Sequence, residues 1–328
     1  MLDALREIVL PSGYDDKEID DIIWSEIKSS PSSGDFAAYL VHRPQKARHR
    51  DEASARFEAI DKNYSADPIA YPRAIERIRA LAESGHAPAM FHMGKVNAYG
   101  IGCDQDLAVA VEWYRKGIAA GEMRAHCNLG WLYQSGYGVP EDKEEGFRLI
   151  MIGAKNGIPS AMASVGSMLL AGEGCQADPA KGLKMLEAAF DAGYNNAGNH
   201  LSDTYFSGQY VPKDVDLGHE WLFKVVARGD ERTMAILGHY LVTGSHGKTD
   251  VKKGLALLHD AINERYLPAY LWLGSLYKNG NGVERDLVKA KIWFEQGTDE
   301  GDQRCEQALA KLLDGTARLP EFGGVTLH

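Results

Sequence analysis

Apolar residues recur at helical spacing, in paired runs, along most of the chain. The stretch from Ala125 to Gly157 reads AHCNLGWLYQSGYGVPEDKEEGFRLIMIGAKNG. It holds one apolar-periodic run, a glycine-rich turn with an aspartate, and a second apolar-periodic run that ends in glycine. Apolar side chains three and four residues apart share one face of a helix, so each run predicts an amphipathic helix. Together the two runs predict a helix pair joined by a short turn.

This pattern repeats with a period of 36 residues. The turn glycines at this spacing are Gly100, Gly136, Gly172, Gly208, Gly244 and Gly280, and the aspartates are Asp106, Asp142, Asp178, Asp214, Asp250 and Asp286. A fixed period of this length indicates stacked supersecondary units rather than a closed globule. The chain is therefore predicted to be all-α and to form one array of helix pairs.

Small residues recur where the two helices of each pair should cross. They are Gly94, Gly130, Gly166, Ser202, Gly238 and Gly274 in the first helices, and Ala110, Gly146, Gly182, Gly218, Gly254 and Ala290 in the second. Glycine inside a helix costs about 1 kcal/mol relative to alanine, so its recurrence predicts close helix crossings. Each aspartate should cap the helix that follows it. Glycines that suit a left-handed turn close the second helices, and Arg265 interrupts that series, which predicts a different turn there.

The array is flanked by segments that follow the period weakly or not at all. Residues 1–50 are predicted to be a non-repeat helical segment, with an amphipathic helix from Asp15 to Ser29. Residues 51–85 read as a degenerate capping repeat, residues 86–301 as six full repeats, and residues 302–328 as a capping helix and tail. A solvated basic loop that can fold back on the acidic helix is expected at Arg43, Lys46, Arg48 and Arg50, with His42 and His49 exposed beside it.

Charge and cysteine content narrow the function. The formal net charge of −10 argues against general nucleic-acid binding and favours a basic peptide or protein as partner. No apolar run approaches the length of a membrane span, so membrane insertion is not expected. The start of the chain, with its acids and with Arg6 and Glu7 inside the apolar run, is unlike a signal peptide. The four cysteines form no CxxC pair, which predicts reduced thiols and a cytoplasmic protein.

The repeat resembles the Sel-one-like repeat, a 36-residue relative of the tetratricopeptide repeat. Segments such as AHCNLGWLYQSGYGVPEDKEEG and AYLWLGSLYKNGNGVERDLVKAKIWFEQG are similar to its pattern of Ala, Leu-Gly, Tyr, Gly-x-Gly-Val, Asp, Ala, Trp-Tyr, Ala-Ala and Gly. The similarity covers residues 86–301, although Tyr210 and His246 replace the second loop glycine in the fourth and fifth copies. The resemblance implies an α/α superhelix (solenoid) of antiparallel helix pairs that serves as an adaptor for assembling proteins.

Partner-binding residues are expected on the first helices, on the face that points away from the core of each pair. If the first helices line the concave side, this face is rich in Trp, His, Tyr and small polar groups, which interface cores favour. The candidate partner-binding residues are His92, Lys95, Tyr99, Asn128, Trp131, His200, Asp203, His239 and Trp272. Trp131 and Trp272 could instead pack between neighbouring repeats, and the sequence leaves both possibilities open.

Signals for catalysis, cofactors and metals are weak. The segment Gly244 to Thr249 resembles the end of a phosphate-binding loop, but Val242 stands where another glycine is needed and the period places the segment between two helices. None of the eleven histidines has a metal-ligand spacing, and no GxSxG elbow occurs. We therefore predict no catalytic, cofactor-binding or metal-binding residues and no cofactor.

The primary hypothesis is a non-catalytic, cytoplasmic interaction scaffold that binds a protein or peptide on its concave face. A narrower version, drawn from the family resemblance, is a bacterial immunity protein that neutralises a secreted toxin by direct binding. The rival class is an enzyme such as a hydrolase. That class would need clustered His and Asp side chains in a pocket outside the repeat core.

Overall fold

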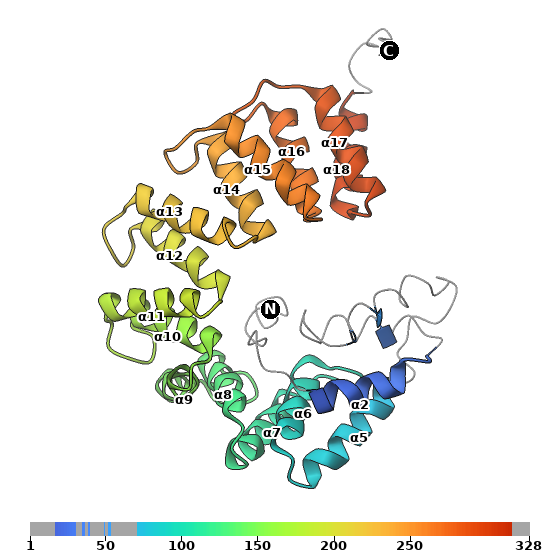
Figure 1. Ribbon diagram of the computed structural model, residues 1–328, viewed down its shortest axis with the longest axis vertical. Helices are drawn as coiled ribbons and strands as arrows, with labels where there is room; N and C mark the ends of the chain where they lie inside the picture. Colours follow the sequence, from blue (N-terminus) through green and yellow to red (C-terminus); the bar gives the residue numbers. More distant parts are fainter. Residues whose placement is uncertain are drawn as a thin grey trace. The chain divides into compact units, whose positions relative to one another are not determined.

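The computed structural model describes residues 17–30, 35, 36, 39, 49, 52, 53 and 71–316. Within these residues the protein consists of helices and turns, with no strand, so the predicted all-α class is confirmed (Figure 1). The chain divides into two compact units, unit 1 from Met1 to Ala197 and unit 2 from Gly198 to His328. In the part of the chain that the structure describes, every helix is too short or too polar to cross a membrane.

Helices of similar length follow one another in both units. Unit 1 contains α2 (Lys17–Ile27), α5 (Tyr71–Glu83), α6 (Ala87–Tyr99), α7 (Leu107–Ala119), α8 (Met123–Ser135), α9 (Lys143–Lys155), α10 (Pro159–Ala171) and α11 (Pro179–Asp191). α12 (Asn195–Ser207) begins at the end of unit 1 and leads into unit 2. Unit 2 continues with α13 (Val215–Val226), α14 (Glu231–Thr243), α15 (Val251–Asn263), α16 (Pro268–Asn279), α17 (Leu287–Asp299) and α18 (Gln303–Thr316). From α6 to α17 the helices form consecutive pairs, each joined by a turn that contains glycine.

The second helix of every pair starts at the predicted aspartate. In all six pairs Oδ1 of the aspartate accepts a hydrogen bond from the backbone N–H three residues later, at 2.9–3.1 Å. The carboxylate satisfies one free donor and lies at the positive end of the helix dipole. The predicted caps are therefore confirmed, and each fixes the residue at which its helix begins.

Within a pair, the two helices cross at the predicted small residues. A Cβ added to Gly130 would lie 2.8 Å from the carbonyl oxygen of Gly146, and a Cβ added to Gly146 would lie 2.8 Å from the carbonyl oxygen of Gly130. Where the second helix carries alanine, the first glycine faces a ring instead, and a Cβ on Gly94 would overlap the ring of Tyr114. Real Cβ atoms are not found this close to backbone, so glycine is required for these crossings.

The turn at Arg265 does not differ in the predicted way. Arg265 takes a φ of 65°, the left-handed conformation that Gly193 (φ 95°) and Gly229 (φ 80°) adopt at the same place in their repeats. Its N–H donates to the carbonyl of Ile262 at 2.8 Å, matching the bond from Gly229 to Val226 at 2.9 Å. The prediction of a different turn was therefore wrong. Arg265 is exposed and holds a conformation that usually costs a residue with a side chain about 1–2 kcal/mol.

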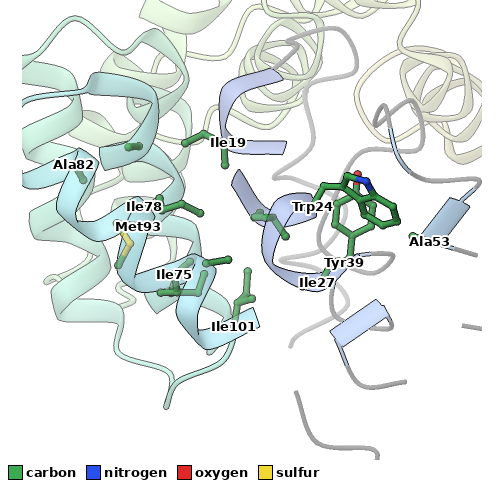
Figure 2. Packing of buried hydrophobic residues seen from close by; sticks show 14 of the residues in the cluster. Ile19, Trp24, Ile27, Tyr39, Ala53, Ile75, Ile78, Ala82, Met93 and Ile101 are labelled. Carbon is green, nitrogen blue, oxygen red and sulfur yellow. The ribbon is translucent and has the colours of Figure 1, made fainter. Parts of the chain in front are cut away.

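The predicted N-terminal amphipathic helix is present as α2 and forms part of the core of unit 1. Ile19, Ile23 and Ile27 are fully buried on one face of α2, in one cluster with residues of α5 and α6 (Figure 2). On another face, Trp24 packs against Tyr39 at a ring-centroid distance of 5.9 Å. Side chains that do not follow the repeat therefore enlarge the first hydrophobic core of the array.

Polar contacts at the edges of α2 fix its position. Nη1 of Arg77 on α5 donates to Glu26 Oε1 at 2.6 Å. The hydroxyl of Tyr39 donates to the buried carboxylate of Asp20 at 2.8 Å. His49, expected to be exposed, instead stacks on Trp24 at 4.8 Å with 7° between the ring planes, because the flat imidazole covers the indole face. The basic residues Arg43, Lys46, Arg48 and Arg50, His42, most of the capping repeat before Tyr71 and the tail after α18 lie outside the described residues.

Candidate functional site

Three of the candidate residues in unit 1 lie inside the protein. His92, Lys95 and Asn128 expose only 1%, 7% and 6% of their surface. α6 is buried at every position from Phe91 to Ala98, so it is enclosed around its whole circumference. A helix enclosed in this way presents no face to a partner. Binding through these three side chains would need unit 1 to open.

Tyr99 and Trp131 are half-buried and contribute to the packing of unit 1. Burial, followed by the neighbouring Tyr114, raises the pKa of Tyr99. Trp131 packs against the cluster of buried side chains that α8, α9 and α10 share. Asn128 Nδ2 donates to the Tyr114 hydroxyl at 3.1 Å, which links the second pair to the first. Contact of these residues with a partner stays a prediction.

The four candidate residues of unit 2 are exposed or half-buried, and Trp272, like Trp131, packs against a cluster of buried side chains, the one that α14, α15 and α16 share. His200 and Asp203 on α12 are exposed, while His239 on α14 and Trp272 on α16 are half-buried. His239 and Trp272 meet edge to face at 5.7 Å, so the structure brings these two together. We call these four residues, which come from the first helices of three successive pairs, the unit 2 face.

Three aromatic residues beside this face were not among the sequence candidates. The rings of Phe206 and His246 stack at 4.1 Å, with 15° between their planes. Tyr240 meets His246 edge to face at 4.3 Å and Phe206 at 6.1 Å. The signal available in the sequence was His246 itself, which occupies a position that is glycine in four of the six copies: Gly102, Gly138, Gly174 and Gly282.

A one-residue shift in the loop explains how a histidine is accommodated there. In the second pair, Gly138 (φ 72°) packs tightly against Leu107, the first residue of α7. In the fifth pair Gly247 (φ 77°) is the left-handed residue, and a Cβ added to it would meet only Val215, the first residue of α13, at 3.8 Å. Because the left-handed residue moves one place later, position 246 needs no glycine. The His246 side chain is then free to contact Phe206 and Tyr240.

The electrostatics around Asp203 differ from those of an ordinary surface acid. Partial desolvation raises the pKa of Asp203, although His200 and His246 oppose this effect. Burial lowers the pKa of His246, with Asp203 acting in the opposite direction. Burial, followed by the charge of Asp203, raises the pKa of Tyr240. The shifts of the two rings favour the neutral forms of His246 and Tyr240 at neutral pH.

Within the described part of the chain, this arrangement lacks the hydrogen-bonded pair that nucleophilic catalysis uses. Nucleophilic catalysis needs a base within hydrogen-bond distance of a nucleophile and an orienting group beyond it. Among the described residues, Asp203 makes no hydrogen bond to His246, and the nearby Ser245 hydroxyl bonds to Thr243 at 2.5 Å. The residues that the structure describes include no group of three or more His, Cys, Asp or Glu side chains suited to a metal ion. The segment Gly244–Thr249 lies between α14 and α15, as predicted, and so lacks the preceding strand of a phosphate-binding loop.

Comparison with known proteins identifies the repeat. A profile of the Sel1 repeat family matches residues 87–122, 124–157, 159–194, 196–230 and 267–302. Residues 231–266 are not among those matched, although α14 and α15 form a pair like the others. This is the copy in which His246 replaces a loop glycine and Arg265 replaces a closing glycine, so the structure retains a pair that departs from the family pattern at two positions.

Relatives share this fold over much of the chain. A protein of Neisseria meningitidis is 26% identical over 250 residues, which cover 75% of this chain and 50% of its own. The crystal structure of a protective antigen of uropathogenic Escherichia coli, described as an SLR fold, aligns with a TM-score of 0.54 and 26% identity over 80% of this chain and 56% of that one. A Sel1 repeat protein of Oxalobacter formigenes aligns with a TM-score of 0.55 and 22% identity, over 69% of this chain and 91% of that one. At this level of identity the similarity supports a shared fold and no shared role.

The chain spans about half the length of the Neisseria and Escherichia proteins. The Sel1 profile, in contrast, matches more than half of this chain. The capped and closely crossed helix pairs supply the geometry on which such a repeat depends. On these grounds the chain belongs to the Sel1 repeat family.

Proposed function

We propose that this chain is a non-catalytic scaffold that binds a protein or peptide through the unit 2 face. The observation that carries the proposal is exposure: His200, Asp203, His239 and Trp272 are exposed or half-buried on neighbouring first helices, whereas His92, Lys95 and Asn128 are buried. Half-buried aromatic side chains beside a single charge are typical of residues that dominate the energy of protein interfaces. The unit 2 face is thus the part of the candidate set that holds fully exposed side chains.

The chemistry of the face supports a basic partner. Asp203 is its acidic residue, and the whole chain carries a formal net charge of −10, which steers basic segments toward it and disfavours nucleic acid. Cys103, Cys127, Cys175 and Cys305 are all unpaired, which supports a reducing, cytoplasmic setting.

Affinity capture from lysate of the source organism, read by quantitative mass spectrometry, tests the proposal. The test variant is Asp203→Ala/Trp272→Ala. The matched control is Asp260→Ala/Trp293→Ala, which removes an exposed aspartate and a half-buried tryptophan from the second helices α15 and α17. We expect a protein that is retained by the wild type and the control and lost by the test variant.

Equal recovery by all three folded proteins would contradict a binding role for this face. Circular dichroism and thermal unfolding verify that each variant is folded. If the captured partner is a toxin whose activity this chain suppresses on co-expression, the scaffold role narrows to that of an immunity protein.

A further inference from the structure

Asp203 carries a carboxylate that the protein itself leaves without a donor. No described residue donates a hydrogen bond to it, and the groups that act on it electrostatically are His200 on the same helix and His246 in the loop after α14. Because Asp203 is exposed, water solvates this carboxylate and a donor from a partner can reach it. A cation from a partner would pair with it and form charge-assisted hydrogen bonds.

Two aromatic side chains lie within electrostatic range of the same carboxylate. Asp203 acts electrostatically on both Tyr240 and His246, whose rings meet at 4.3 Å. The ring of Phe206 stacks on that of His246 at a centroid distance of 4.1 Å. We call Asp203, Phe206, Tyr240 and His246 the Asp203 cluster. A carboxylate next to aromatic rings suits a flat cation that can pair with the acid and stack on a ring.

Unit 1 already contains an arginine that pairs with an acid and lies over an aromatic ring. At the start of α8, Arg124 donates from Nε and Nη2 to the two carboxylate oxygens of Glu122, at 2.8 and 2.7 Å. The same guanidinium lies over the ring of Phe91, 4.6 Å from its centroid. Glu122 and Phe91 therefore hold an arginine between an acid and an aromatic ring. The Asp203 cluster has the acid and the rings, and no described arginine occupies it.

We propose that the Asp203 cluster binds the guanidinium group of an arginine in a protein partner. The inference deepens the proposed function and rests on it, because it names the chemical group that the unit 2 face would recognise. Arginine fits better than lysine because its planar fork can form two parallel hydrogen bonds to one carboxylate while its face stacks on a ring. An ammonium group offers the charge without this shape.

Nuclear magnetic resonance titration of the full chain tests the inference with a defined probe. The probe is N-acetyl-arginine amide, and the control is N-acetyl-citrulline amide, which has nearly the same shape without the positive charge. We expect the arginine probe to shift the amide resonances of Asp203, Tyr240 and His246 saturably and to bind at least about tenfold more tightly than citrulline. Asp203→Asn should abolish this preference, and Asp260→Asn, on the second helix α15, should retain it.

Equal shifts with citrulline, an unchanged titration of Asp203→Asn, or no saturable shift with either probe would each overturn the inference. The capture experiment separates this failure from failure of the proposed function. A partner that needs Trp272 but binds Asp203→Asn as tightly as wild type would support the scaffold role and contradict arginine recognition by the Asp203 cluster. A saturable arginine titration without any captured protein would support arginine binding at the Asp203 cluster and count against the scaffold role.

Discussion

Units 1 and 2 are built from the same repeat, yet equivalent positions of that repeat have different environments in the two units. Lys95 exposes 7% of its surface, whereas Asp203, three periods later, is exposed. His92 exposes 1%, whereas His200, also three periods later, is exposed. A repeat period fixes where the backbone turns and which side chains fill each pair. Exposure of the remaining positions depends on what else packs there.

The extra packing in unit 1 involves residues outside the repeat. α2 and the side chains of Phe36, Tyr39 and Ala53 share a single core with α5 and α6. Ala89, Met93 and Val96 of α6 belong to this core, and α6 is buried at every position from Phe91 to Ala98. We therefore expect that weakening this core lowers the stability of unit 1 and leaves the unit 2 face unchanged.

The largest effect is expected from Trp24→Ala in unit 1. Trp24 exposes 7% of its surface and contacts Phe36, Tyr39 and His49, so its removal should lower the free energy of unfolding by about 4 kcal/mol. Trp272→Ala on the half-buried unit 2 face should cost about 1.5 kcal/mol or less. Urea denaturation measures both, and hydrogen exchange should show faster exchange in α6 for the first variant only. Similar losses for the two variants would mean that Trp272 is a core residue.

A second contrast concerns the acids of the two units. Burial alone would raise the pKa of Glu122, but its hydrogen bonds and ion pair with Arg124 outweigh burial and lower it. Arg124→Ala leaves that carboxylate buried and unpaired, and should cost about 3 kcal/mol at neutral pH. Because the folded pKa is lowered, the stability that this pair contributes is complete above the ordinary glutamate pKa of about 4.3 and disappears as pH falls through the folded value.

Asp203→Asn provides the opposite case. The folded pKa of Asp203 is raised, so its charge destabilises the folded state at neutral pH, and removing the charge should leave stability unchanged or slightly higher. Unfolding free energies measured at neutral pH and again near pH 3 compare the two sites. A loss of stability in Asp203→Asn as large as that in Arg124→Ala would show that Asp203 has a partner within the fold.

Acidic pH should weaken arginine binding at the Asp203 cluster. Burial lowers the pKa of His246, so its imidazole is neutral at pH 7 and becomes charged only as pH falls below its ordinary value of about 6.5. A charged His246 would compete with the guanidinium for Asp203. His200 on α12, Tyr240 on α14 and Lys213, whose charge reaches His246, also face this region.

The measurement repeats the N-acetyl-arginine amide titration at about pH 7.5 and about pH 5.5, where affinity should fall about fivefold. His246→Phe keeps an aromatic ring at this position and removes the titrating nitrogen, so most of the loss should disappear. Protonation of Asp203 itself acts in the same direction, because its folded pKa is raised. An unchanged loss in His246→Phe would assign the effect to Asp203 or His200 instead of His246.

The smallest effect is expected at the turn before α16. Arg265 holds a φ of 65° where the equivalent residues of other repeats are glycine, so Arg265→Gly should raise the free energy of unfolding by about 1 kcal/mol. Gly229→Ala, at the equivalent turn before α14, should lower it by a similar amount. Thermal unfolding under identical conditions compares the two substitutions. A destabilised Arg265→Gly would indicate that the arginine side chain contributes more than its backbone conformation costs.

Local chemistry explains why so much of the fold was predictable. A cap such as Asp142, a crossing such as Gly130 against Gly146, and a closing residue such as Gly229 each act within one helix pair, so the period in the sequence carries the information. The all-α class, the pair boundaries and the family follow from those positions alone. The left-handed Arg265 was the exception, because the closing hydrogen bond of the other repeats forms there although the residue disfavours that conformation.

The candidate site was only partly predictable because exposure and side-chain contact arise between elements. Lys95 and Asp203 occupy the same position in their repeats, and only tertiary packing encloses the first and leaves the second at the surface. His246 could be noticed as a departure from glycine, but its contact with Phe206 depends on a left-handed residue moving one place along the loop. The sequence by itself determined the helix pairs, through short-range capping and steric effects. The tertiary structure decided which of their faces remain available, because burial is a property of everything that packs against a residue.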